Sequence, residues 1–355
     1  MTAGIASPLN WEGGIDGYLS LLDQTELPGR ETWLAIRDVA SLCGAIHRLS
    51  VRGAPAIGIA GAFGIVIAAQ HAAAHGEQVF EQRVASDAQR IGATRPTAVN
   101  LQWAVDRMMA ALRRGRPDSP ESAISLLLKE AQSIHHEEIA SCESIARFGE
   151  PLIKEGSGVL THCNAGPLAT GGMGTALAPL LLAHGRGRRF RVYADETRPL
   201  LQGARITMWE LLRAGMDATL LCDGAAASLM AEGKIQLVIV GADRIARNGD
   251  VANKIGTMSV ALLARAFGIP FYVAAPFSTV DLQTPAGRDI PIEHRDPQEV
   301  AKFGGFATAP ANCKVYSPAF DVTPGHLIAG LITERGIVCP VTEGGLAQVG
   351  AASPP

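Results

Sequence analysis

The sequence predicts an α/β protein with a mostly helical N-terminal domain followed by a Rossmann-like domain built on a parallel sheet. Two observations predict this fold class. The hydrophobic pattern changes near Ser157, from apolar residues at helical spacing to short apolar runs that alternate with helix-length segments. The 355 residues also fit two domains of roughly 150 residues each. We place the helical domain, with a small sheet, at residues 1–130 and the Rossmann-like catalytic domain at residues 131–355.

The first part of the chain contains periodic segments that are typical of amphipathic helices. Val39, Leu42 and Ile46 fall on one stripe, and Pro55 suits the first turn of the helix that follows. The predicted helices span residues 38–49, 56–73, 77–91, 97–112 and 119–148. Two short segments before them, 17–22 and 32–36, are predicted to form a small sheet.

The second part alternates apolar runs of strand length with helical segments, which is the pattern of a parallel sheet with right-handed crossovers. The predicted strands span residues 158–162, 190–194, 218–222, 237–241 and 270–274. The predicted helices span residues 172–183, 203–214, 224–232 and 254–267. Ligands of such folds bind at the carboxyl ends of the strands, so we expect the site just after them.

Composition excludes several classes of protein. The formal net charge is −3, from 31 Lys and Arg against 34 Asp and Glu, which argues against nucleic acid or a membrane surface as a partner. Six cysteines without a CxxC pair suggest reduced thiols and a cytoplasmic location, and the N-terminus lacks a signal-peptide pattern. The apolar run at residues 53–69 is rich in Gly and Ala, and predicts a packed core helix rather than a membrane span.

The common nucleotide, hydrolase and zinc signatures are absent from the sequence. There is no P-loop, no G-x-G-x-x-G after the first predicted strand, no G-x-S-x-G and no H-E-x-x-H. The run of two histidines and two glutamates at residues 135–138 lies on a predicted helix, where adjacent residues diverge, so a surface helix is the better interpretation. We expect neither a metal nor an organic cofactor.

Two basic turns precede predicted helices in the first part of the chain. Arg52, Gly53 and Ala54 place a cation beside the N-terminus of a helix, where exposed N–H groups attract a phosphate. Arg95 repeats this arrangement before Pro96. The alternatives are a tight turn with Arg52 paired to a carboxylate and an ordinary helix start at Arg95.

Two candidate catalytic groups follow predicted strands. Cys163, in the turn Thr161 to Gly166, lies near helix N-termini that favour a thiolate, which can act as a base or nucleophile. Asp243 follows an apolar strand, and apolar surroundings favour a carboxyl that can act as a general acid. The alternatives are a buried structural cysteine, and a helix cap or an ion pair with Arg244.

Further polar residues are candidates for binding a hydroxyl-rich ligand. Asn253 and Lys254 are expected at a helix start, where the alternative is a helix cap followed by a solvated lysine. Gln202 offers both donors and an acceptor. Asp195 or Glu196 could pair structurally with Arg198. The residues alone therefore indicate an α/β enzyme for a small phosphorylated polyol, without fixing its reaction.

Several blocks of this sequence together resemble the methylthioribose-1-phosphate isomerase family. The wider family includes ribose-1,5-bisphosphate isomerases and the regulatory subunits of the eukaryotic initiation-factor exchange complex. The match runs from Gly17 to about Val338. Its blocks are RGAPAIG at 52–58, TRPTAVNL at 94–101, THCNAG at 161–166, DETRP at 195–199, LQGAR at 201–205 and GADRIARNGDVANKIGT at 241–257.

The resemblance implies an aldose–ketose isomerase that converts 5-methylthioribose 1-phosphate to 5-methylthioribulose 1-phosphate in methionine salvage, as a homodimer. Cys163 and Asp243 match the family's catalytic pair. The matching substrate-binding positions are Arg52, Gly53, Ala54, Arg95, Gln202, Asn253 and Lys254. Because phosphate blocks the anomeric oxygen, the ring oxygen must be protonated, and we assign Asp243 as the acid and Cys163 as the base or charge stabiliser.

Two alternatives stay open at this point. One is an isomerase of another pentose 1-phosphate, such as ribose 1,5-bisphosphate or 5-deoxyribose 1-phosphate. The other is a non-catalytic regulatory subunit, which could lose Cys163 and Asp243 without penalty, whereas this chain keeps both.

Overall fold

The computed structural model describes residues 7–95 and 99–351. Its internal contacts group the chain into two units, each described here by itself. The helical unit comprises residues 7–143 and 166–174 of the described chain, and the sheet unit comprises residues 144–165 and 175–351. The expected domain boundary after residue 130 falls inside a long helix and stays a prediction.

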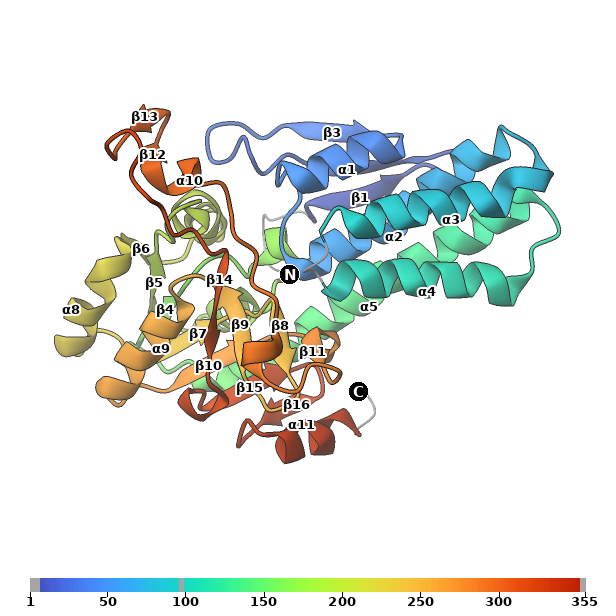
Figure 1. Cartoon of the computed structure of the whole chain (residues 1–355). Coiled ribbons are helices and arrows are strands. Elements are labelled where there is room, and N and C mark those ends of the chain that lie inside the picture. Colours follow the sequence, from blue (N-terminus) through green and yellow to red (C-terminus); the bar gives the residue numbers. More distant parts are fainter. Residues whose placement is uncertain (1–6, 96–98, 352–355) are drawn as a thin grey trace. The chain divides into compact units, whose positions relative to one another are not determined.

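The helical unit contains a small antiparallel sheet and a group of helices (Figure 1). The strands are β1 (Leu9–Glu12), β2 (Tyr18–Leu22) and β3 (Trp33–Ile36), paired in the order β1-β2-β3. The helices are α1 (Val39–His47), α2 (Ala54–Ala73), α3 (Glu77–Ala93), α4 (Val99–Gly115) and α5 (Pro120–Gly149), of which α5 continues into the sheet unit. The sheet and helices predicted here are confirmed, except that Thr97 lies outside the described residues.

Helix α2 is the core of the helical unit. Its glycines face neighbouring helices closely: a Cβ on Gly58 would lie 2.9 Å from the Asn100 carbonyl oxygen of α4. The helix is long and apolar enough to cross a membrane, but 83% of its most apolar window is buried within the structure. A helix that is apolar all round and buried is a core helix, as its sequence predicts.

The segment Gly166–Gly174 interrupts the sheet unit and packs in the helical unit. Gln24 Nε2 donates to the Leu168 carbonyl at 2.8 Å, and His135 Nε2 lies 3.1 Å from the Gly171 carbonyl. Gly53 also lies against Ala169, so closely that a Cβ on Gly53 would overlap its backbone.

The sheet unit is built on a seven-stranded sheet in the order β16-β15-β10-β7-β4-β5-β6. The strands are β4 (Gly158–Thr161), β5 (Arg191–Asp195), β6 (Ala218–Leu221), β7 (Leu237–Val240), β10 (Phe271–Ala274), β15 (Gly330–Thr333) and β16 (Gly336–Val338). All neighbours are parallel except β15 and β16. The expected Rossmann-like sheet is confirmed, and the sequence did not predict β15 and β16.

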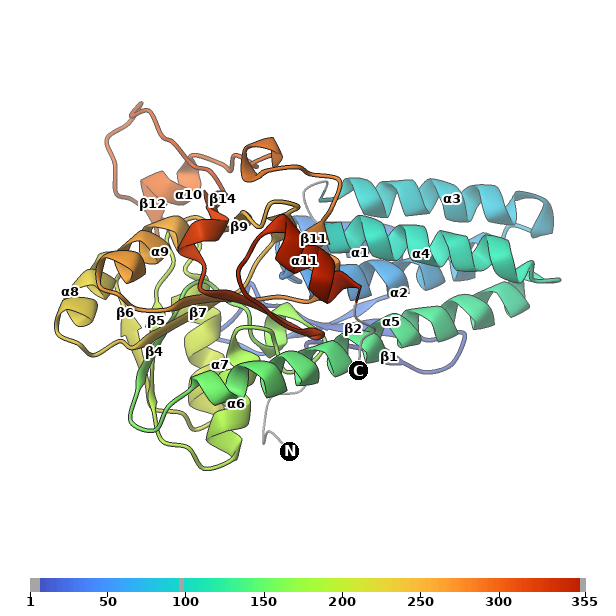
Figure 2. The same cartoon turned by 90° about the horizontal axis from the view of Figure 1, so that it is seen from below.

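The strand order reverses beside β4, which is the first strand of this sheet in the chain. From β4 the chain moves outward through β5 and β6, and then returns to the other side of β4 with β7 and β10. Figure 2 shows α6 (Leu177–Gly185) and α7 (Met208–Arg213) on one side of the strands, and α8 (Ala226–Ala231) and α9 (Thr257–Ala266) on the other. Open sheets of this kind bind ligands where the order reverses, here between the carboxyl ends of β4 and β7.

A second sheet of four short strands, which the sequence did not predict, has the order β11-β8-β9-β14. Its strands are β8 (Arg244–Ala246), β9 (Val251–Lys254), β11 (Val280–Asp281) and β14 (Phe320–Thr323). Besides short 3-10 helical turns, the sheet unit also contains α10 (Gln298–Ala301), the hairpin β12 (Lys302–Phe303) and β13 (Phe306–Ala307), and α11 (Glu343–Gly350).

Two predicted helices begin later than expected. The helix expected from Gly172 begins at Leu177, because Gly174 has φ +90° and the glycines before it do not favour a helix. The helix expected from Lys254 begins at Thr257, after Gly256 in the left-handed region at φ +103°. The predicted helix over 203–214 is present, but opens with a π-helical turn at Gly203–Thr207.

Candidate active site

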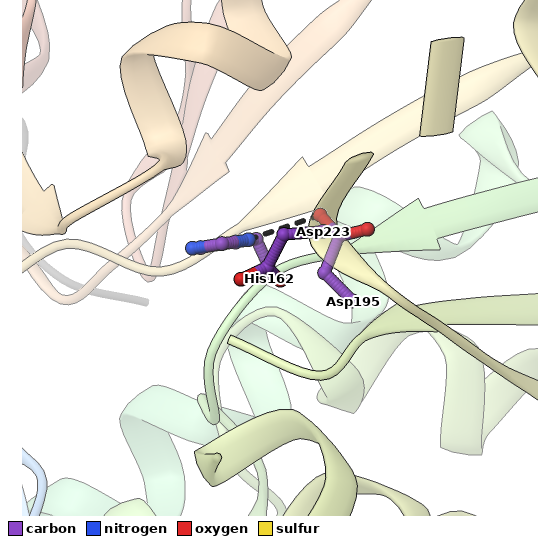
Figure 3. Close-up of side chains that lie close together, drawn as sticks. All are labelled: His162, Asp195 and Asp223. Carbon is purple, nitrogen blue, oxygen red and sulfur yellow. Dashed lines mark hydrogen bonds and ion pairs between the residues drawn. The ribbon is translucent and has the colours of Figure 1, made fainter. Parts of the chain in front are cut away.

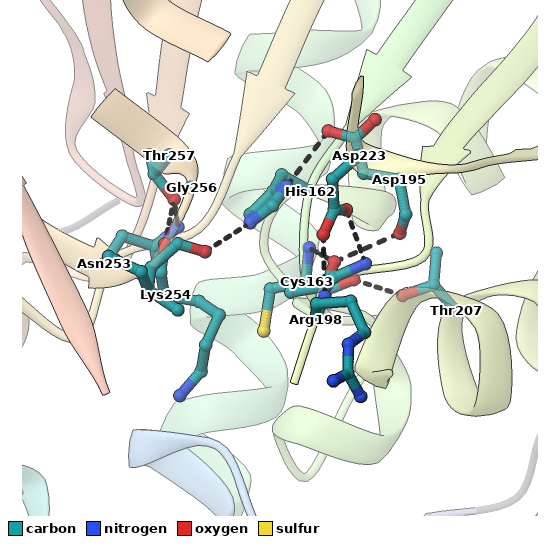
Figure 4. Close-up of polar contacts among 12 residues, drawn as sticks. His162, Cys163, Asp195, Arg198, Thr207, Asp223, Asn253, Lys254, Gly256 and Thr257 are labelled. Carbon is teal, nitrogen blue, oxygen red and sulfur yellow. Dashed lines mark hydrogen bonds and ion pairs between the residues drawn. The ribbon is translucent and has the colours of Figure 1, made fainter. Parts of the chain in front are cut away.

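Cys163 lies just beyond the carboxyl end of β4, with its backbone fixed on both sides by threonine hydroxyls (Figure 4). Its N–H donates to Thr197 Oγ1 at 2.8 Å, and its carbonyl accepts from Thr207 Oγ1 at 2.6 Å. The residue has φ +64°, a left-handed conformation that non-glycine residues rarely adopt. Such strain persists only where the surroundings impose it, so these contacts orient the half-buried side chain.

Thr197 is itself held by the ends of two further strands. Its hydroxyl donates to the Asp195 carbonyl at 3.0 Å, at the end of β5. The carboxylate of Asp223, which follows β6, accepts from the N–H groups of Thr197 and Arg198, both at 2.7 Å. The ends of β4, β5 and β6 are thus connected through Thr197.

His162 forms a buried pair with Asp195 (Figure 3). Its Nδ1 lies 3.0 Å from Asp195 Oδ2, and its Nε2 lies 2.9 Å from the Ile255 carbonyl oxygen. Because a carbonyl only accepts, Nε2 must carry a proton. Burial opposes the charged imidazole, but the hydrogen bond and the charge of Asp195, with the Ile255 carbonyl, place the pKa of His162 above its ordinary value.

His162, Asp195 and Asp223 are residue types that bind metals, and their potential ligand atoms lie within 4.8 Å of one another. Hydrogen bonds already use His162 Nδ1, Asp195 Oδ2 and both Asp223 oxygens, whereas Asp195 Oδ1 is buried and accepts none from the described residues. His162 Nδ1 shares a proton with Asp195, and both Asp223 oxygens accept backbone N–H groups. The group therefore fits a hydrogen-bonded cluster better than a cation site. The expectation that no metal or cofactor is needed stays a prediction.

Asp243 follows β7, the neighbour of β4, as the sequence predicts. Gly241 packs against the Cys163 turn: a Cβ on Gly241 would lie 2.7 Å from Ala165 Cβ. The Asp243 N–H donates to the Ala252 carbonyl at 3.0 Å, and its side chain is half-buried. Arg244 contacts Asp281 at 3.4 Å. The two candidate catalytic residues thus follow adjacent strands, where the strand order reverses.

Asn253 and Lys254 do not start a helix, so that prediction is wrong. They end β9, and pair in register with Asp321 and Phe320 of β14, which holds them in extended conformation. Lys254 is 8% exposed, with its ammonium 4.5 Å from the centre of the Phe320 ring. Figure 4 shows the Lys254 ammonium and the Cys163 sulfur pointing to the same side, away from His162 and Asp223.

Gln202 lies at the N-terminus of the π-helical turn and is 4% exposed. Its Oε1 is buried and accepts no hydrogen bond from the part of the chain that the structure describes. A buried amide oxygen without a donor is costly, and a ligand hydroxyl would satisfy it. Arg198 does not pair with the expected acids: it donates to the carbonyls of Pro199 and Val300, and Asp195 pairs with His162.

The remaining predicted binding residues belong to the helical unit. Gly53 has φ +88° and precedes α2, whose first turn has no side-chain cap there and contains Pro55. Arg52 and Ala54 flank this glycine, so a half-buried cationic residue directly precedes the N-cap of α2. Arg95 is half-buried and lies two residues after the end of α3. The helix start predicted at Pro96 lies outside the described residues.

Sequence reasoning assigned no role to four residues of the site: His162, Thr197, Thr207 and Asp223. Asp223 follows a predicted strand, and His162 and Thr197 lie inside the family-like blocks, so their positions carried a signal. Their roles depend on contacts between distant segments, which local patterns do not encode.

The sequence model of the Initiation factor 2 subunit family matches residues 50–340. The chain belongs to this family. A methylthioribose-1-phosphate isomerase of Pelotomaculum thermopropionicum is 53% identical over 332 residues, which cover 94% of this chain and 91% of that protein. A 5-deoxyribose 1-phosphate isomerase of Moorella thermoacetica is 49% identical over 343 residues, 97% of each chain.

A solved structure extends this likeness within the Initiation factor 2 subunit family. The crystal structure of 5-methylthioribose 1-phosphate isomerase from Pyrococcus horikoshii has a TM-score of 0.91 and 38% identity, and covers 98% of this chain and 96% of that one. The mixed fold, with helical and parallel-sheet parts, is therefore shared along nearly the whole chain.

Proposed function

We propose that this chain is an aldose–ketose isomerase that converts 5-methylthioribose 1-phosphate to 5-methylthioribulose 1-phosphate, a step of methionine salvage. The observation that carries the proposal is the placement of Cys163 and Asp243 after adjacent strands, where the strand order reverses. The names of two relatives that are about 50% identical over nearly their whole length support the same reaction.

The substrate's own chemistry assigns the roles of the two residues. A phosphate on the anomeric oxygen prevents ring opening by loss of the anomeric proton. The Asp243 carboxyl protonates the ring oxygen instead, and the ring opens as the C1–O bond to that oxygen breaks. One hydrogen then moves from C2 to C1, and the C2 hydroxyl becomes the ketone by losing its proton, which balances the proton that Asp243 gave to the ring oxygen. Cys163 acts as the base for this transfer or stabilises the charge that develops during it.

The binding residues divide the substrate between phosphate and hydroxyl contacts. Arg52, the backbone at Gly53 and Ala54, and Arg95 supply cationic and N–H donors suited to the phosphate. Gln202 Oε1 and the Asn253 amide suit sugar hydroxyls, and Lys254 suits an anionic oxygen. Lys254 is buried beside Phe320 and contacts its ring, which lowers the cost of keeping its charge there.

Phosphorus NMR of 5-methylthioribose 1-phosphate tests the proposal with wild type, Cys163→Ser and Asp243→Asn. We expect wild type alone to form the ketose phosphate. Cys313→Ser and Asp217→Asn, both at exposed residues, are the matched controls and should convert substrate as wild type does. Conversion by all variants would contradict the assigned pair. Solvent deuterium at C1 of the product would support proton transfer, and its absence would support hydride transfer.

A second substrate is favoured by one specific observation. The Moorella relative, at 49% identity, is named for 5-deoxyribose 1-phosphate, which differs from the first substrate in its 5-substituent. Parallel assays give kcat/KM for both compounds, and the larger value identifies the preferred one. A folded wild type that binds both compounds but converts neither would favour the regulatory-subunit alternative.

We infer that the protein is a cytoplasmic homodimer. Six cysteines without a disulfide among the described residues support a reducing compartment. The edge strand β6 and helix α7 expose Leu220 at 46% and Leu212 at 60%, which supports a subunit interface there. Light scattering after gel filtration should give a mass near twice 37.2 kDa, and Leu212→Lys with Leu220→Lys should halve it.

A further inference from the structure

His162 connects three parts of the sheet unit that carry proposed site residues. It directly precedes Cys163 in the chain. Through Nδ1 it contacts Asp195 at the end of β5, and through Nε2 the carbonyl of Ile255. Ile255 follows Lys254 directly, so the second contact reaches the turn that follows Asn253 and Lys254 at the end of β9.

We infer that His162 is a positioning residue, whose two ring nitrogens fix Cys163 relative to Asn253 and Lys254. The inference rests on the proposed function for its kinetic consequences, but not for its geometry. His162 is 2% exposed and does not need to reach the substrate to act in this way. It acts through the residues on either side of it.

The surroundings leave the His162 ring little freedom. Gly256 follows Ile255 with φ +103°, and a Cβ there would lie 2.7 Å from His162 Cε1. The carboxylate of Asp321 accepts from the Gly256 N–H at 2.8 Å and the Met258 N–H at 3.1 Å, which fixes the same turn from its other side. The ring therefore lies between a fixed turn and the end of β5. We expect that a change in the hydrogen bonds of the ring moves either the turn or the end of the strand.

The two ring contacts have separable consequences. The Nδ1 contact joins His162 to Asp195, whose carbonyl accepts from the Thr197 hydroxyl that holds the Cys163 N–H. The Nε2 contact joins His162 to the turn directly after the proposed substrate-binding residues Asn253 and Lys254 of β9. Loss of the first should disturb the chemical step, and loss of the second should disturb substrate binding.

Two substitutions separate the contacts. His162→Gln places an amide nitrogen near the position of Nε2, so it keeps a donor to Ile255 and loses the Asp195 contact. His162→Asn places its amide near the position of Nδ1, so it keeps the Asp195 contact and loses Ile255. For His162→Gln we expect kcat to fall roughly 10- to 100-fold with KM nearly unchanged, because a small displacement of a reacting group costs about that much.

For His162→Asn we expect KM for 5-methylthioribose 1-phosphate to rise about tenfold, the effect of losing about 1.4 kcal/mol of binding. His184→Gln, in the last turn of α6, is the matched control and should keep wild-type kcat and KM. Equal changes in kcat and KM for both His162 variants, or wild-type values for both, would overturn the inference. Asp195→Ala removes the Nδ1 contact by itself if His162→Gln does not fold.

A readout without substrate keeps this test separate from the proposed function. The alkylation rate of Cys163 by iodoacetamide, followed by peptide mass spectrometry, should change in His162→Gln. The exposed Cys313 and Cys339 of the same sample should react as in wild type. An unchanged Cys163 rate in a folded variant would overturn the inference. A wild type inactive on every pentose 1-phosphate, with a changed Cys163 rate in the variant, would overturn only the proposed function.

Discussion

The backbone N–H of Cys163 donates a 2.8 Å hydrogen bond to the side-chain hydroxyl of Thr197, a residue 34 positions further along the chain. Both residues have positive φ, +64° for Cys163 and +63° for Thr197. Two residues with side chains in the left-handed region, joined by one hydrogen bond, store strain at the end of the sheet. The proposed catalytic thiol is therefore positioned through hydrogen bonds of its own backbone to threonine side chains.

Thr197→Val should reduce both activity and stability. The Cys163 N–H would lose its acceptor, which costs about 1–3 kcal/mol of unfolding free energy for a buried group. The displaced thiol should lower kcat roughly tenfold or more. Thr197→Ser keeps the hydroxyl and is less hindered at positive φ, so its kcat and melting temperature should remain near wild type. Similar kcat values for the Val and Ser variants would contradict this role of the hydroxyl.

Gln202→Met should weaken substrate binding while leaving the fold as stable as wild type or more so. The substitution removes a buried amide oxygen that accepts no hydrogen bond within the described chain. Removing it relieves a desolvation cost of about 1 kcal/mol in the free protein, and deletes a contact to a substrate hydroxyl. Calorimetry and steady-state kinetics measure the two effects. Gln348→Met, on the exposed face of α11, is the control, and a Gln202→Met variant with unchanged KM would exclude Gln202 from binding.

Gly256→Ala should destabilise the protein more than an ordinary glycine substitution at positive φ. The left-handed conformation costs about 1–2 kcal/mol for alanine. The Cβ would also lie 2.7 Å from His162 Cε1, and such overpacking costs a further 1–3 kcal/mol or so. Gly268→Ala isolates the first cost, because Gly268 has φ +68° and no described atom within 4 Å of the added Cβ. Urea unfolding compares the two, and equal losses would contradict the close contact.

Asp38→Ala should destabilise the helical unit in a pH-dependent way. Hydrogen bonds from the Ser41 hydroxyl and N–H, both 2.7 Å, hold the pKa of the Asp38 carboxyl below its ordinary value. A lowered folded-state pKa gives stability that is complete above the unfolded pKa of about 3.9, and is lost as pH falls through the folded value. Asp38→Ala should lower the free energy of unfolding by about 1 kcal/mol at pH 7 and by less at pH 3. Asp38→Asn, which keeps a side-chain acceptor for the helix cap, should lower it little at pH 7. A destabilisation by Asp38→Ala that is the same at pH 7 and pH 3 would contradict this role of the ionised carboxyl.

The sequence predicted the four strands whose carboxyl ends lead to Cys163, Asp195, Asp223 and Asp243, because parallel strands in a covered sheet are short apolar runs that stand out between helices. It also placed these residues at the correct edge, since the carboxyl ends of parallel strands share one edge. The order of the strands was not predictable in this way. That order depends on contacts between distant segments, and it decides that Cys163 and Asp243 follow neighbours.

The placement of Asn253 and Lys254 on a helix failed for a reason that the sequence contains. Asn248 and Gly249 form an Asn-Gly pair with an apolar pair on either side, Ile245-Ala246 and Val251-Ala252, which is a signal for a hairpin. The structure has that hairpin, β8 to β9, closed by the Ala246 N–H to the Asp250 carbonyl at 2.8 Å. By contrast, His162 finds its partners 33 and 93 residues away, and no local pattern indicates such a pair.

The excursion of Gly166–Gly174 has a consequence for how this protein can be divided. The chain leaves the sheet unit three residues after Cys163, contributes to the helical unit, and returns at Thr175. A single cut at any junction would therefore leave one product without a segment that it needs. Recombination at one crossover point cannot exchange either unit for that of a relative. A gene split between residues 143 and 144 would deprive the first product of the segment Gly166–Gly174, against which Gly53 packs. No single division of the chain therefore gives two products that each contain one whole unit.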